Sequence, residues 1–144
     1  MPVVPINYLA VLVCGVAAML LGFLYFGPLF GKLYSRLMGF DAMDPLAREE
    51  LKKGMGKSYM ITFVGSLVTA WVLAHAIIYA GNYMHWSGLT AGLATGFMSW
   101  LGFMATVTLG NVLWGRQSWK LWTLSNGHNL LQLLVFGAIL GTWK

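Results

Sequence analysis

Long apolar stretches without any charge alternate with short polar, basic segments along the sequence. The uncharged stretches are Met1 to Gly31, Ser58 to Gly115 and Leu121 to Trp143. A membrane-spanning helix needs about 20 apolar residues, so the first and last stretches each predict one span, and the longer middle stretch predicts two spans and a tight turn. The pattern therefore predicts an all-α polytopic membrane protein, a single four-helix bundle over residues 1–144, with spans at about 6–30, 58–80, 89–113 and 121–143.

The hydrophilic segment from Lys32 to Lys57 predicts one short helix between the first two spans. Asp44 followed by Pro45 is typical of an N-cap and the first helical position, and Gly54 is typical of a helix end. We expect this helix, about Pro45 to Lys53, to lie on the membrane surface. A solvated connector is the favoured interpretation, and a docking site for a partner is the alternative.

Small residues recur at helical spacing in all four spans. Such residues let two helix backbones approach closely, and they serve packing far more often than chemistry. The predicted helix-packing residues are Gly15, Ala18 and Gly22 in the first span, Gly65 and Thr69 in the second, Gly92, Gly96 and Ser99 in the third, and Gly137 and Gly141 in the fourth.

Composition supports a membrane protein and the basic residues predict its orientation. The 144 residues are 58% hydrophobic and 9% charged, whereas a soluble domain has about 25% charged residues. Eight of the nine Lys and Arg residues lie in the two segments between spans one and two and between spans three and four, and Lys144 is the exception. The positive-inside rule places these two basic segments in the cytoplasm and both termini outside. The net charge of +5 is explained in this way, without a nucleic-acid partner.

The spans contain no residues for common enzyme chemistry. None of them carries Asp or Glu, which excludes a carboxylate pair, an Asp that orients a histidine, and a carboxylate-containing metal site. Cys14 is the only cysteine, so no intrachain disulfide is possible, and we expect it to be a small packing residue. No enzyme activity, metal or cofactor is predicted.

Polar side chains are concentrated in the inner half of the last span. At 100° per residue, Ser125, His128, Asn129 and Gln132 share an arc of about 100°, and Asn126 lies to one side, nearer the two glycines. Asn111, at the inner end of span three, lies at a similar depth. An unpaired amide facing lipid costs about 2–7 kcal/mol. This face is therefore predicted to look inward or toward another subunit.

Three interpretations of this polar face remain open. The favoured one is an interhelical network, in which the amides and His128 bond to Asn111, Thr108 or the backbone of span one. A second is a ligand or ion site open to the cytoplasm, where His128 could take a proton. A third is a ring or pigment ligand on His128. A haem with two histidine ligands is disfavoured, because His75 lies toward the opposite end of the membrane.

Several segments together resemble a known family. They are FGPLFGKLYSRLMG from Phe26, MGKSY from Met55, LGNVLW from Leu109, and NGHNLLQLLVFGAILGTWK at the end. These segments resemble the domain-of-unknown-function 1761 family of small bacterial membrane proteins, over nearly the whole chain. The resemblance implies a four-helix protein of the bacterial cytoplasmic (inner) membrane, and it provides no catalytic residues.

The sequence thus predicts a non-enzymatic membrane subunit or accessory protein. We expect its small-residue faces to pack against a second copy, as a homo-oligomer, or against a larger membrane complex within the lipid bilayer. The alternative is a small transporter or channel with a cytoplasm-facing site at His128, Asn129, Gln132 and Asn111.

Overall fold

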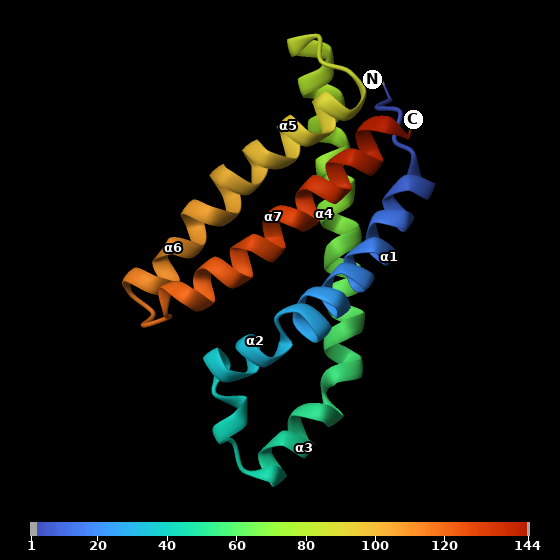
Figure 1. The fold of residues 1–144 in the computed structure, drawn as a ribbon. Coiled ribbons are helices and arrows are strands. Elements are labelled where there is room, and N and C mark those ends of the chain that lie inside the picture. Colours follow the sequence, from blue (N-terminus) through green and yellow to red (C-terminus); the bar gives the residue numbers. More distant parts are fainter. Residues whose placement is uncertain (1–2, 144) are drawn as a thin grey trace.

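The computed structural model describes residues 3–143, and all regular elements in this part of the chain are helical (Figure 1). Lys144, the basic residue predicted on the outer side, lies outside the described residues. The elements are α1 (Tyr8–Leu24), the π-helical turn η1 (Tyr25–Leu29), α2 (Gly31–Met38), the 3-10 turn η2 (Phe40–Ala42), α3 (Pro45–Lys53), α4 (Met55–Met84), α5 (Gly88–Trp100), the π-helical turn η3 (Leu101–Ala105), α6 (Thr106–Leu113) and α7 (Trp119–Thr142).

Three helical stretches are long and apolar enough to cross a membrane. They are Tyr8–Leu29 with 22 residues, Met55–Met84 with 30 and Gly88–Leu113 with 26. The fourth long helix, α7, has 24 residues but is not among them, because Asn126, His128, Asn129 and Gln132 interrupt its apolar sequence. The all-helical class and three apolar helices suited to a membrane are therefore confirmed. The fourth span stays a prediction.

Local sequence signals explain where α1 begins and ends. The Asn7 side chain caps α1 by accepting a hydrogen bond from the Ala10 backbone N–H at 3.1 Å. Near the other end, Pro28 has no backbone N–H to donate, and the chain widens there into the π-helical turn η1. A new helix, α2, follows directly and was not predicted, although Gly39, its C-cap with a left-handed φ of 76°, is a local signal for its end.

The short helix predicted after span one is confirmed as α3, while its position on the membrane surface stays a prediction. It begins at Pro45, where the Asp44 side chain accepts from the Leu46 N–H at 3.5 Å, and it ends with Gly54 as its C-cap. The next helix, α4, starts at Met55, so only Gly54 separates the two. Arg48 in α3 also holds the preceding turn, since its Nε donates to the Phe40 carbonyl oxygen at 2.9 Å.

Helix α4 is longer than the sequence predicted. The expected span covered residues 58–80, whereas the helix runs from Met55 to Met84, because nothing between these residues breaks it. It ends at His85, whose backbone has a left-handed φ of 57°, a conformation that histidine adopts more readily than most residues. The turn between α4 and α5 is therefore reduced to the few residues before Gly88.

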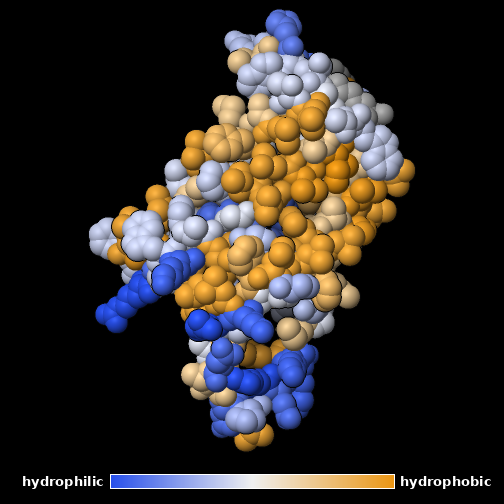
Figure 2. All heavy atoms as spheres, in the orientation of Figure 1, coloured by the Kyte–Doolittle hydropathy of each residue, from blue (hydrophilic) through white to orange (hydrophobic). Residues whose placement is uncertain are grey.

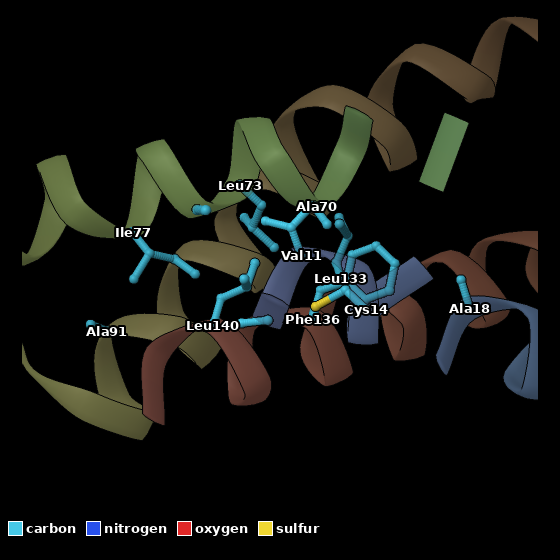
Figure 3. Close-up of a cluster of buried hydrophobic side chains, with 12 residues drawn as sticks. Val11, Cys14, Ala18, Ala70, Leu73, Ile77, Ala91, Leu133, Phe136 and Leu140 are labelled. Atoms are coloured by element: carbon cyan, nitrogen blue, oxygen red, sulfur yellow. The ribbon is translucent and has the colours of Figure 1, made fainter. Parts of the chain in front are cut away.

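The apolar core lies where α1, α4, α5 and α7 meet (Figure 3). Phe136 of α7 is fully buried at its centre. The core residues are Ala10, Val11, Cys14 and Ala18 of α1, Ala70, Leu73, Ala74 and Ile77 of α4, Ala91 of α5, and Leu133, Phe136 and Leu140 of α7. As expected from its apolar surroundings, Cys14 is a buried packing residue.

The closest helix contact joins α5 to α7 through four of the predicted packing glycines. A Cβ on Gly92 would overlap the Gly137 backbone and a Cβ on Gly137 would overlap Gly92, while a Cβ on Gly96 would lie 2.6 Å from the Leu133 carbonyl oxygen. At Gly141 it would lie 2.5 Å from the Gly88 carbonyl oxygen. These two helices can approach so closely only because the four positions lack side chains.

The other predicted packing residues differ in their surroundings. Gly15 and Ala18 are buried on α1, and a Cβ on Gly15 would lie 2.6 Å from Leu67 Cδ2 of α4. Thr69 and Ser99 are half-buried, and Thr69 donates only to the Gly65 carbonyl oxygen of its own helix. Gly65 is exposed and meets no atom within 4 Å of an added Cβ. The face of α4 that packs inside the molecule is instead formed by Ser66, Ala70, Leu73, Ala74 and Ile77.

Both ends of the described chain lie together at one end of the molecule (Figure 1). The Asn7 side-chain amide there donates to the Trp143 carbonyl oxygen at 3.5 Å. The connector with α2 and α3 and the turn between α6 and α7 lie away from the termini (Figure 1). A broad hydrophobic band separates these hydrophilic ends (Figure 2), which is the surface that a membrane-spanning protein requires.

Candidate functional site

The polar residues of α7 continue the face that forms the apolar core. Asn129 and Gln132 precede Phe136 by seven and four residues, so all three lie on one side of the helix. Toward the termini this side is filled by Phe136 and Leu140, whereas Ser125, Asn129 and Gln132 are half-buried. Hydrophilic atoms are visible over the middle of α7, surrounded by hydrophobic surface (Figure 2). The core thus changes from apolar to polar along the length of α7.

The change coincides with the divergence of α4 from the other helices. Residues 55–62 of α4 are all exposed, and its buried residues begin at Ser66. The half of the core that contains Ser125, Asn129 and Gln132 therefore lacks the wall that α4 provides nearer the termini. None of the side-chain hydrogen bonds that α7 makes within residues 3–143 comes from Ser125 or Gln132.

Asn126 lies apart from this row and ties α7 to α6. It is 3% exposed, and its Nδ2 donates to the Thr108 hydroxyl at 3.0 Å and to the Trp122 carbonyl oxygen at 3.1 Å. Trp122 Nε1 donates to the same hydroxyl at 3.1 Å. Because the Thr108 hydroxyl oxygen accepts these two hydrogen bonds, the hydroxyl donates its own hydrogen to the Met104 carbonyl oxygen, at 2.6 Å.

Trp100 extends this network to the other end of the π-helical turn. Its indole Nε1 donates to the Asn126 carbonyl oxygen at 3.0 Å. Trp100 precedes η3 (Leu101–Ala105) and Thr108 follows it, so Asn126 binds the chain on both sides of the turn. The wider π-helical turn changes the register of the helix. The side chains of Trp100 and Thr108 therefore both reach Asn126 of α7.

His128 is enclosed by aromatic rings at the end of α1. The centre of its ring lies 5.2 Å from that of Tyr25 and 4.8 Å from that of Phe26. Its Nε2 is buried and has no hydrogen-bond partner among the described residues. Gly22 lies beside the ring, and a Cβ there would make an ordinary contact with Nε2 at 3.9 Å. A partnerless polar nitrogen at this depth is the least satisfied feature of the predicted site.

Asn111 does not join the polar row of α7. Its side chain is exposed on α6, and its backbone carbonyl oxygen accepts from the Gln117 N–H at 3.0 Å across the turn to α7. The structure therefore brings His128 close to Tyr25 and Phe26, and Asn126 close to Thr108. It leaves Asn111 outside both groups.

The sequence pattern did not predict Trp100, Trp122 and Tyr25 as polar partners. The Tyr25 hydroxyl donates to the Leu124 carbonyl oxygen at 2.7 Å, which fixes the end of α1 against α7. A signal for all three was available, because an indole N–H or a phenol in a membrane segment usually needs an acceptor. The sequence does not tell which acceptor each one finds.

A cavity of about 540 Å³ lies at the end near the termini. Its walls include Asn7, Asn82 and Trp86 over an apolar floor that contains Ala74 and Leu140. Of the residues that the sequence singled out, only Gly141 lines it. Within residues 3–143 no group of three His, Cys, Asp or Glu side chains comes close enough to hold a metal ion.

The comparisons with known proteins identify a family. The model of the family described as "Protein of unknown function (DUF1761)" matches residues 9–141. No curated protein and no solved structure matches the chain.

Proposed function

The chain belongs to the DUF1761 family of proteins of unknown function, and for this member we propose a four-span membrane subunit that acts by association and not by catalysis. Its partner is a second copy of the chain or a larger membrane complex. The observation that carries the proposal is the uncovered start of α4, where residues 55–62 are all exposed.

The proposal takes α7 as the fourth span. With 24 residues the helix is about 36 Å long, enough to cross the hydrocarbon layer. Its polar residues do not oppose this assignment, because Asn126 is buried and bonded, and Ser125, Asn129 and Gln132 are half-buried on the side of α7 that forms the core. A span that is sheltered on its polar side does not need to be apolar on all sides.

The uncovered face of α4 has the composition of a helix contact. Ser58, Thr62, Gly65 and Thr69 follow one another at intervals of four, three and four residues and form one exposed or half-buried line. The Ser58 hydroxyl donates to the carbonyl oxygen of Gly54, the N-cap of α4, and the Thr69 hydroxyl donates to that of Gly65. Small residues whose polar groups are already bonded allow a second helix to approach closely.

The experiment replaces Gly65 with Leu and measures association of the full chain in lipid nanodiscs or mild detergent, by native mass spectrometry. We expect the wild-type chain to form a dimer or to retain a membrane partner, and Gly65→Leu to lose it, because the larger side chain keeps the helices apart. Gly102→Leu is the matched control: Gly102 is also exposed in an apolar span, with no atom within 4 Å of an added Cβ. A strictly monomeric wild-type protein that captures nothing would contradict the proposal.

A second function, a ligand or ion site for transport, is favoured by the buried His128 Nε2 without a partner. This site would use His128, Asn129 and Gln132 and not the exposed Asn111. Replacing His128 and Asn129 with Leu distinguishes the two functions. A transport site predicts loss of flux or ligand binding with the melting temperature unchanged, whereas a structural network predicts a lower melting temperature.

A further inference from the structure

An open, mainly apolar groove of about 550 Å³ lies between η1, α2 and the first turns of α7. Its floor is formed by Tyr25, Leu124 and Gly127. The hydrogen bond from the Tyr25 hydroxyl to the Leu124 carbonyl oxygen, at 2.7 Å, fixes this floor. Gly127 keeps it open, because a Cβ there would lie 2.9 Å from the Tyr25 hydroxyl oxygen. The groove is therefore a consequence of how α1 and α7 pack.

The walls of the groove present apolar and aromatic side chains that no described residue covers. Phe30 and Leu33 are 38% and 39% exposed on one side, and Trp119 is 58% exposed on the other. Aromatic residues of this kind are enriched at the level of lipid headgroups, and the apolar surface beside them suits an acyl chain.

The charge of the groove is positive. Lys120 is the charged residue among those that line it. Arg36 follows Leu33 by one helical turn on α2, and neither α2 nor residues 115–124 contain Asp or Glu. Cationic side chains beside an apolar surface at the membrane boundary favour lipids with a negative headgroup.

We propose that this groove binds one anionic phospholipid, with an acyl chain against Tyr25 and Leu124 and the phosphate at Lys120. The occupant is a lipid because the groove combines an apolar floor with a single cation, at the end of the molecule where the hydrophobic band meets the basic segments (Figure 2). This site is separate from the uncovered face of α4 and does not depend on association of the chain.

The test titrates the purified full-length chain, in mild detergent, with phosphatidylglycerol or with phosphatidylcholine of identical acyl chains, and counts bound lipids by native mass spectrometry. One basic residue at a membrane surface contributes about 1 kcal/mol, so we expect the first phosphatidylglycerol to bind about fivefold more tightly than phosphatidylcholine. Lys120→Gln should remove this preference. Lys52→Gln, the same change on exposed α3 and outside the groove, should keep it.

A second variant tests the groove itself. Thr123 is exposed and lines the groove, so Thr123→Trp should fill the groove. We expect this variant to bind the first molecule of either lipid about tenfold more weakly, which corresponds to a loss of about 1.4 kcal/mol of binding free energy. Equal effects of Lys120→Gln and Lys52→Gln, or undiminished binding to Thr123→Trp, would overturn the proposal. Displacement of the lipid by glycerol 3-phosphate at equal concentration would also overturn it, because a free phosphate site needs no acyl chain.

Discussion

At the scale of single residues, Asn126 and Gln132 show that amides on one helix can have opposite roles. Asn126 donates to two acceptors and is buried, while Gln132 is half-buried and takes no part in the hydrogen bonds among the described residues. A bonded amide inside a membrane protein stabilises the fold, and an unbonded one needs another partner. Asn126 and Gln132 therefore need different experiments.

Replacing Asn126 with Ala should lower stability by about 1–3 kcal/mol, because the Thr108 hydroxyl loses a donor and the site becomes a small cavity. The melting temperature in detergent, followed by circular dichroism, measures the change. Asn111→Ala is the control with the same chemistry, and at an exposed position it should change stability by less than about 0.5 kcal/mol. Equal melting temperatures of the two variants would mean that the Asn126 network is not structural.

The polar face of α7 was predicted at this scale only in part. Helical spacing placed Asn126 to one side of Ser125, His128, Asn129 and Gln132, because the rotation per residue is constant, and Asn126 is buried whereas the other four are half-buried. It did not predict that Asn111 is exposed or that Tyr25 and Phe26 surround His128. These facts depend on how α1 and α6 are placed against α7, and spacing within one helix contains no information about that.

At the scale of elements, the contact between α5 and α7 depends on four positions without side chains. Gly137→Ala should destabilise the protein by about 1–3 kcal/mol, the usual range for forcing an extra methyl group into a packed interface, because the new Cβ would overlap the Gly92 backbone. The midpoint of thermal unfolding in detergent is the measurement.

Gly110→Ala is the control for the effect of replacing a helical glycine with alanine where no neighbouring helix is close. Gly110 lies in α6 with no atom within 4 Å of an added Cβ, so the change should raise stability by up to about 1 kcal/mol through helix propensity alone. A stabilising effect of both variants would show that the close approach of α5 and α7 is not required.

The element boundaries also show why some helices are predictable. Asp44, Pro45 and Gly54 define α3 locally, and the structure confirms both of its ends. The additional residues of α4 and the π-helical turns η1 and η3 were not predicted. Caps act through neighbouring residues, whereas a π-helical turn inside an apolar helix is stabilised by tertiary contacts such as those of Trp100 and Thr108 with α7.

At the scale of the whole molecule, the basic residues and the positions of the termini carry the prediction of topology. Both ends of the described chain lie together, away from the connector that contains α3 and from the turn before α7 (Figure 1). With the basic segments in the cytoplasm, as the positive-inside rule requires, the turn between α4 and α5 faces outward. Termini on one side of the membrane predict an even number of spans, with α7 as the fourth.

Single cysteines test this topology, since the natural Cys14 is buried and the wild-type chain measures background labelling. A maleimide that does not cross membranes should label Ser87→Cys, in the α4–α5 turn, on intact cells. It should label Lys52→Cys on α3 and Ser118→Cys before α7 only after permeabilisation, because all three positions are exposed and only the membrane separates them from the reagent. Labelling of Lys52→Cys and Ser118→Cys from opposite sides would place an odd number of spans between them and exclude the four-span arrangement.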